Sequence, residues 1–148
     1  MRKLVGIIIY ITICSLCFTL GLSIKRNCSY PIVPIDSCLV DSFTIKDFVL
    51  ELHLQGIKHS DWVLRQACLE SGYFTSTVWK ECNNPFGFYY KGEYLQFNDY
   101  KSAIAYYKTW QNKWYSGGDY LEFLDKIGYA TDLEYEKKLK RINLNNLK

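Results

Sequence analysis

The residue best suited to chemistry in this sequence is Glu70, near the C-terminal end of a predicted helix. Ser60 and the acidic residue after it are typical of a helix start, and Gly72 is typical of a helix end. On such a helix Val63, Ala67 and Glu70 share one face, so the carboxyl lies beside an apolar stripe. Apolar surroundings and the negative end of the helix dipole both raise a carboxyl pKa, as a general acid requires. The alternative is a solvated glutamate at a frayed helix end.

Four motifs follow one another along the chain. They are Leu69-Glu70-Ser71-Gly72; Cys82-Asn83-Asn84-Pro85-Phe86-Gly87; Phe97 with Tyr100 and Ser102; and Gly128-Tyr129-Ala130-Thr131-Asp132 with Tyr135, Lys138 and Leu139. In this order they resemble the motifs of bacterial glucosaminidase domains, glycoside hydrolase family 73. Each motif is weak alone, but the shared order argues against a chance match. The resemblance implies a lysozyme-like fold, an activity that cuts peptidoglycan, and Glu70 as the catalytic acid.

Two more catalytic candidates follow from this resemblance. Glycoside cleavage commonly uses a second carboxylate, and Glu93 is the natural candidate in the predicted β-lobe. The alternatives are that the acetamido group of the substrate takes this role and that Glu93 is only an exposed charge. The resemblance also implies that Tyr129 lies in the cleft and supports sugar binding or transition-state charge near Glu70. A purely apolar contact ahead of a helix cap would explain Tyr129 as well.

Substrate contacts are predicted for Tyr73, Asn84, Phe86 and Tyr89, all in the lobe that follows the first motif. Tyr73 and Phe74 stand where the family often has Trp-Gly, a departure that alters the wall of the cleft. Asn84 precedes Phe86 in a segment typical of a tight turn, whose amide side chains can hold backbone or sugar groups. The alternative for this segment is turn structure alone.

The elements that must position these residues are mostly helices. Hydrophobic spacing and capping residues predict helices over 44–54, 60–72, 102–114 and 119–127, and a last helix that begins with a capping box from Thr131 to Glu134. Residues 87–97 predict a β-hairpin with Lys91-Gly92 at its turn. The predicted fold class is therefore mainly α, a lysozyme-like α+β fold in which a helical domain carries a short β-hairpin lobe.

Composition is that of one packed domain. The chain has 148 residues, of which 49% are hydrophobic and 17% aromatic, enough for a real core. A net charge of +3 is mild, fits work near an anionic polymer such as a cell wall, and gives no reason to expect a nucleic-acid partner.

The histidines and cysteines do not have the spacing of a metal site. His53 and His59 belong to no metal-ligand pattern, so no metal and no organic cofactor is expected. Cys68 and Cys82 could form a disulfide in an exported protein, or remain free thiols.

The N-terminus indicates export. Arg2 and Lys3 precede an uncharged apolar stretch over 4–24, which is long enough to span a bilayer as a helix, although a small-residue cleavage site ends at Ser23. We therefore divide the chain into a signal anchor or signal peptide (1–25), a tether (26–43), a glucosaminidase-like domain (44–142) and a tail (143–148). The predicted location is the cell envelope, outside the cytoplasm, membrane-anchored through the N-terminal helix or secreted.

These inferences predict an endo-β-N-acetylglucosaminidase-like glycoside hydrolase. Its partner would be the glycan strands of peptidoglycan, which it would cut at the β-1,4 bond after N-acetylglucosamine, with Glu70 as general acid. The sequence does not separate this bond from the one after muramic acid. The alternative function is a catalytically inactive peptidoglycan-binding or scaffolding module. The short β-lobe and the altered residues after Gly72 motivate that alternative.

Overall fold

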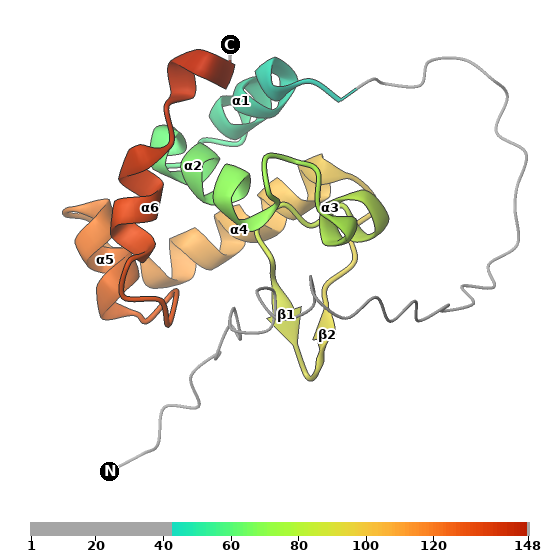
Figure 1. Ribbon diagram of the computed structural model, residues 1–148. Coiled ribbons are helices and arrows are strands. Elements are labelled where there is room, and N and C mark those ends of the chain that lie inside the picture. Colours follow the sequence, from blue (N-terminus) through green and yellow to red (C-terminus); the bar gives the residue numbers. More distant parts are fainter. Residues whose placement is uncertain (1–42, 148) are drawn as a thin grey trace, which may run out of the picture.

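The computed structural model describes residues 43–147, which form a helical body with one small hairpin (Figure 1). In chain order the elements are α1 (Ile45–Leu54), α2 (Ser60–Glu70), α3 (Thr77–Cys82), β1 (Tyr89–Tyr90), β2 (Glu93–Tyr94), α4 (Tyr100–Trp114), α5 (Tyr120–Lys126), α6 (Tyr135–Arg141) and the 3-10 helix η2 (Leu144–Leu147). This confirms the prediction of a mainly helical protein with a short hairpin for the described part of the chain.

The predicted N-terminal helix at 1–25 and the tether up to residue 42 lie outside the described residues. Within 43–147, no helix is both long enough and apolar enough to cross a membrane.

The helix α1 begins where the sequence indicates and supplies the centre of the core. Thr44 caps it, because its hydroxyl oxygen accepts a hydrogen bond from the Asp47 backbone N–H at 3.1 Å. Phe48 and Leu52, four residues apart on one face, are fully buried. Through this face α1 packs against α2 and α4.

The helix α2, which ends at Glu70, begins differently from the prediction. His59, in a left-handed conformation with φ +54°, precedes the helix, and no side chain caps its first N–H groups, so the predicted Ser60 cap is wrong. A side-chain contact with α6 stabilises the helix instead. Arg65 donates to the backbone carbonyls of Leu139, at 3.1 Å, and of Ile142, which fastens α2 to α6.

Two further helix starts differ from the sequence-based expectation. The short helix α3 was not predicted; Ser76 caps it by accepting from the Trp79 N–H at 3.2 Å. At the start of α6, Thr131 is not the cap, because Asp132 accepts from the Glu134 N–H at 2.9 Å. The helix therefore begins at Tyr135, and this places Tyr135 in its first turn.

The hairpin matches its prediction. Tyr89 pairs with Tyr94 and Tyr90 with Glu93 in antiparallel register. Both residues of the Lys91-Gly92 turn have positive φ, +50° and +92°, as the tight turn of a two-residue hairpin requires. Figure 1 shows the hairpin extending away from the helices.

The segment 143–148, expected to be a polar tail, contains η2, whose Leu144 and Leu147 pack against the core. Between η2, α1 and the start of α2 lies a groove of about 810 Å³, lined in part by apolar side chains such as Val49 and Leu64. It contains none of the candidate site residues.

The core position of α1 gives a matched test of the fold. We expect Leu52→Ala to lower the free energy of unfolding by about 2–5 kcal/mol, because a fully buried side chain is lost and a cavity remains. Leu54→Ala, in the same helix at a side chain that is 71% exposed, should change it by less than about 0.5 kcal/mol. Urea unfolding followed by circular dichroism measures both. Equal losses would contradict the described packing of α1.

Candidate active site

Glu70 is the last residue of α2, and its carboxyl group is the central feature of the site. The residue as a whole is partly exposed, but the carboxyl end lies deep among other groups. The Tyr135 hydroxyl donates a hydrogen bond to Glu70 Oε1 at 2.9 Å. Burial raises the pKa of Glu70 to about 7, and the bond from Tyr135 lowers it in part. The raised pKa agrees with the prediction, with burial as its cause.

Gly87 covers the other oxygen of the same carboxyl. A Cβ placed on Gly87 would lie 3.5 Å from Glu70 Oε2 and 3.8 Å from Glu70 Cβ, so the loop backbone runs directly against the acid. The residue has φ +64°, a conformation that glycine adopts without strain. Glycine here therefore serves both the turn and the close approach to Glu70.

Asn84 holds this loop in place. Its Nδ2 donates to the carbonyls of Phe88 and Leu95, each at 2.9 Å, and its Oδ1 accepts from the Phe88 N–H at 3.0 Å. The side chain is 1% exposed. All of these bonds are to the protein backbone, which fits the alternative that this segment only forms a turn. The contact of Asn84 with sugar remains a prediction.

Two tyrosines approach Glu70 from the α6 side. Tyr129 is buried and its hydroxyl donates to the Phe86 carbonyl at 3.5 Å, while its ring lies 5.8 Å from that of Tyr135. Burial raises the pKa of both hydroxyls above the usual range, and the negative charge of Glu70 adds to this. The structure thus brings both tyrosines near the acid. Tyr135, which the sequence offered only as part of the fourth motif, makes the direct bond.

Phe86, predicted to contact substrate, is buried, and Glu93, predicted as the second carboxylate, is exposed. Phe86 is fully buried, with its ring 4.4 Å from that of Tyr107, so it is a core residue that supports the wall of the site. Glu93 is exposed on β2, next to the hairpin turn. Among residues 43–147 no hydrogen bond joins it to Glu70.

The other predicted substrate contacts are aromatic side chains with exposed surface. Tyr73 is 52% exposed, and Tyr89 is half-buried with its ring 5.0 Å from that of Tyr94. The hairpin also exposes Tyr90, at 58%. Exposed aromatic faces of this kind can stack on sugar rings.

The chain makes a left-handed turn directly after the helix that carries Glu70. Gly72, Tyr73 and Phe74 have φ values of +57°, +56° and +61°. Ser71 stabilises this turn by accepting from the Phe74 N–H at 2.8 Å. The Phe74 ring is buried, 4.9 Å from the ring of Phe43. Tyrosine and phenylalanine rarely adopt this conformation, so the packing of Phe74 must offset its cost.

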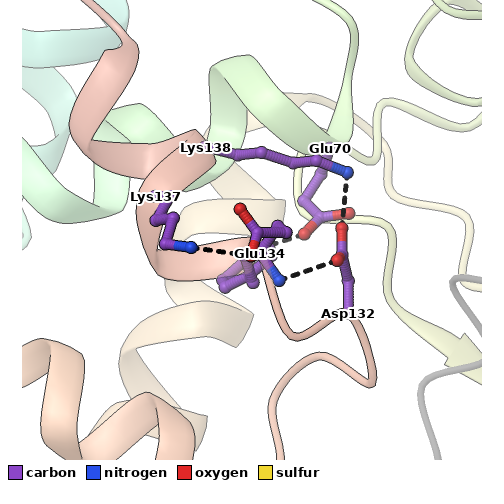
Figure 2. A network of polar contacts seen from close by, with 6 residues as sticks. Glu70, Asp132, Glu134, Lys137 and Lys138 are labelled. Atoms are coloured by element: carbon purple, nitrogen blue, oxygen red, sulfur yellow. Dashed lines mark hydrogen bonds and ion pairs between the residues drawn. The ribbon is translucent and has the colours of Figure 1, made fainter.

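Charged groups gather at the start of α6, and Glu70 reaches this region from the end of α2 (Figure 2). Lys138 pairs with Asp132 at 2.5 Å, and Lys137 pairs with Glu134 at 2.8 Å. These pairs are largely exposed, so they contribute little to stability, but they place balanced charge around the site.

Cys68, two residues before Glu70, is a buried free thiol, so the considered disulfide between Cys68 and Cys82 is not formed. Burial raises the pKa of Cys68 to about 11, which keeps the thiol neutral and unreactive near neutral pH. Cys68 is therefore a core residue of α2.

The geometry thus comprises a buried acid, a tyrosine hydroxyl on one of its oxygens and a glycine loop on the other. A sequence model of the glucosaminidase family, described as mannosyl-glycoprotein endo-beta-N-acetylglucosaminidase, matches residues 46–147. Comparisons with curated proteins and with solved structures gave no match. The matched region spans more than half of the chain and contains all the candidate site residues. The chain therefore belongs to the glucosaminidase family, a family of glycoside hydrolases that act on peptidoglycan.

Proposed function

We propose that this protein is a peptidoglycan hydrolase with a lysozyme-like fold, and that it cuts the β-1,4 bond after N-acetylglucosamine. Glu70 is the general acid. The observation that carries this proposal is a carboxyl group whose pKa burial raises to about 7, at the junction of α2, α6 and the loop at Gly87. A group with this pKa is partly protonated at neutral pH and gives up its proton readily.

The two oxygens of Glu70 have different roles in this mechanism. Oε1 accepts from Tyr135, so Oε2, beside Gly87, is the oxygen that carries the acidic proton. This proton passes to the glycosidic oxygen as the bond from that oxygen to the anomeric carbon breaks, and the leaving sugar departs as an alcohol. Glu70 is then a carboxylate, which the Tyr135 hydroxyl stabilises. A water molecule that adds to the anomeric carbon returns a proton to Glu70.

The second group in the reaction is the acetamido group of the substrate. Its carbonyl oxygen bonds to the oxocarbenium-like anomeric carbon as the glycosidic bond breaks, and the water that then adds to this carbon displaces that oxygen and restores the acetamido group. A nearby second carboxylate is therefore not needed as nucleophile. The exposed position of Glu93 beside the hairpin turn supports this choice over Glu93 as base or nucleophile. Tyr73 and Tyr89 supply aromatic surface for the glycan strand.

A comparison of three proteins tests the acid. We expect wild type to release fragments with N-acetylglucosamine at the reducing end from purified peptidoglycan. Glu70→Gln should lower the rate at least about 100-fold, because the amide cannot donate the proton. Glu93→Gln is the matched control and should retain most of the activity. Mass spectrometry of the products identifies the bond that is cut.

Each other outcome has a definite meaning. Loss of activity in Glu93→Gln with unchanged folding would make Glu93 the second catalytic group. Products with muramic acid at the reducing end would show that the protein cuts the bond after muramic acid instead. If wild type binds peptidoglycan and does not cut it, the protein is the binding or scaffolding module instead.

The pH dependence of cleavage follows from the protonation state of the acid. The value of kcat/KM should fall above about pH 7, tenfold per pH unit, because Glu70 must be protonated in the free enzyme. Rates measured on soluble glycan fragments between pH 5 and 9 would show this. A rate that stays level to pH 9 would contradict the role of Glu70 as acid.

Stability should change with pH through the same group, independently of catalysis. The pKa of Glu70 is higher in the folded state, about 7, than the ordinary value of 4.5, so the folded state holds the proton more tightly. The stabilisation is complete below the ordinary pKa and is lost as pH rises to the folded value. Wild type should therefore lose up to about 3 kcal/mol relative to Glu70→Gln between these limits. Urea unfolding of both proteins at pH 4.5 and pH 8 measures the difference. If the free energy of unfolding changes equally in wild type and Glu70→Gln between these pH values, a raised pKa of Glu70 is excluded.

A further inference from the structure

A chain of buried hydrogen bonds runs from Glu70 across the helical body. Behind Tyr135, Gln66 Nε2 lies 3.5 Å from the Tyr135 hydroxyl, and the Tyr107 hydroxyl donates to Gln66 Oε1 at 2.6 Å. The Tyr107 and Tyr120 hydroxyls are 2.5 Å apart, and Gln111 Nε2 donates to Tyr120 at 3.1 Å. These residues come from α2, α4, α5 and α6, so the chain joins the helices around the site.

The backbone of Lys58 fixes the direction of every bond in this chain. Its N–H donates to Gln111 Oε1 and its carbonyl accepts from Gln111 Nε2, each at 2.9 Å, so the Gln111 amide has only one orientation. The second Nε2 proton goes to the Tyr120 hydroxyl. Tyr120 must then donate its own proton to Tyr107, because that hydroxyl is its remaining partner in the chain.

The same reasoning carries the direction to Glu70. Tyr107 has already accepted from Tyr120, so its proton goes to Gln66 Oε1. This orients the Gln66 amide so that Nε2 faces Tyr135. The Tyr135 proton is then free to go to Glu70. Every donor from Gln111 onward therefore points toward the acid, and bonds aligned in this way polarise one another.

We propose that Gln66, Tyr107, Tyr120 and Gln111 are positioning residues for the general acid, which keep the Tyr135 proton directed at Glu70 and so tune how readily that carboxyl gives up its own proton. As a role in catalysis this rests on the proposed function. As a property of the carboxyl it can be tested without any substrate. The longest link, 3.5 Å from Gln66 to Tyr135, limits how strongly the distant residues act.

Within the described part of the chain, few other titratable groups face Glu70. Tyr135 on α6 makes the hydrogen bond, and Tyr129 in the preceding segment lies close enough to respond to the charge of Glu70. The Asp132–Lys138 ion pair stands at the start of α6 (Figure 2). On the hairpin side Gly87 presents only backbone. The tyrosines stay neutral below pH 9, so a change in the titration of Glu70 reports on hydrogen bonds.

The test is a direct titration of Glu70 in the full-length protein. Carboxyl-carbon NMR of protein labelled at glutamate follows each carboxyl between pH 3 and 9, and the spectrum of Glu70→Gln assigns the resonance of Glu70. The variant is Tyr107→Phe, which removes the hydroxyl from the chain and keeps the ring. Tyr115→Phe is the matched control: its hydroxyl donates to the Gly118 carbonyl and its ring lies 5.1 Å from that of Tyr120, yet it is outside the chain.

We expect the pKa of Glu70 to rise by about 0.3 unit in Tyr107→Phe, because a less polarised Tyr135 hydroxyl stabilises the carboxylate less. Tyr135→Phe should raise it by about one unit or more, since the direct bond is lost. Tyr115→Phe should leave it unchanged. The alkaline limb of kcat/KM should move upward by the same amounts.

Equal titration of Glu70 in Tyr107→Phe and Tyr115→Phe would overturn the proposal. If Tyr107→Phe does not fold, Tyr120→Phe breaks the chain one step farther away and is judged by the same upward shift. If Tyr107→Phe shifts the titration of Glu70 but the wild-type protein does not cut peptidoglycan, the hydrogen-bond chain is upheld and the proposed function is refuted. The two failures are therefore distinguishable.

Discussion

The burial of one carboxyl group sets the requirements for its surroundings. Removing Glu70 from water disfavours its charged form, and among the described residues it receives one side-chain hydrogen bond in return, from Tyr135. The proton consequently stays on the group until pH reaches the neutral range. Three separate segments must meet to produce this environment: the end of α2, the glycine of the loop at 87, and the first turn of α6. A shift in any one of them would admit water and return the carboxyl toward its ordinary behaviour.

Buried polar side chains inside the helical body help to fix the relative positions of the helices. Gln66 and Gln111 are fully buried, and no buried side-chain nitrogen or oxygen in the described part of the chain lacks a hydrogen-bond partner. A hydrogen bond has a direction and a length, so it specifies how α2, α4 and α5 lie relative to one another more strictly than apolar contact does. The apolar contacts around it supply most of the stability.

The sequence predicted the helices and the hairpin better than it predicted the neighbours of Glu70. Periodicity located α1 and α4, and the glycine in the Lys91-Gly92 turn indicated the hairpin. The predicted starts of α2 and α6 were wrong: no side chain caps α2 after His59, and Asp132 rather than Thr131 accepts a backbone N–H just ahead of α6. Local pattern also does not show which tyrosine of a motif reaches a carboxyl 65 positions away, so Tyr129 was favoured and Tyr135 made the bond. Phe86 resembles a ligand-facing aromatic in sequence, and only packing shows that it is buried.

The left-handed turn behind Glu70 has a mechanical consequence. Its stability depends on the burial of Phe74, and the ring that packs on Phe74 belongs to Phe43, the first residue of the described chain. Phe43 also lies 4.7 Å, ring to ring, from Trp79 of α3. A pulling force on the chain upstream of Phe43 would therefore bear first on this aromatic cluster and through it on the turn that ends α2. Because Phe43 also contacts Phe48 of α1 and Tyr100 of α4, such a force would act at once on the turn beside Glu70 and on the helices of the core.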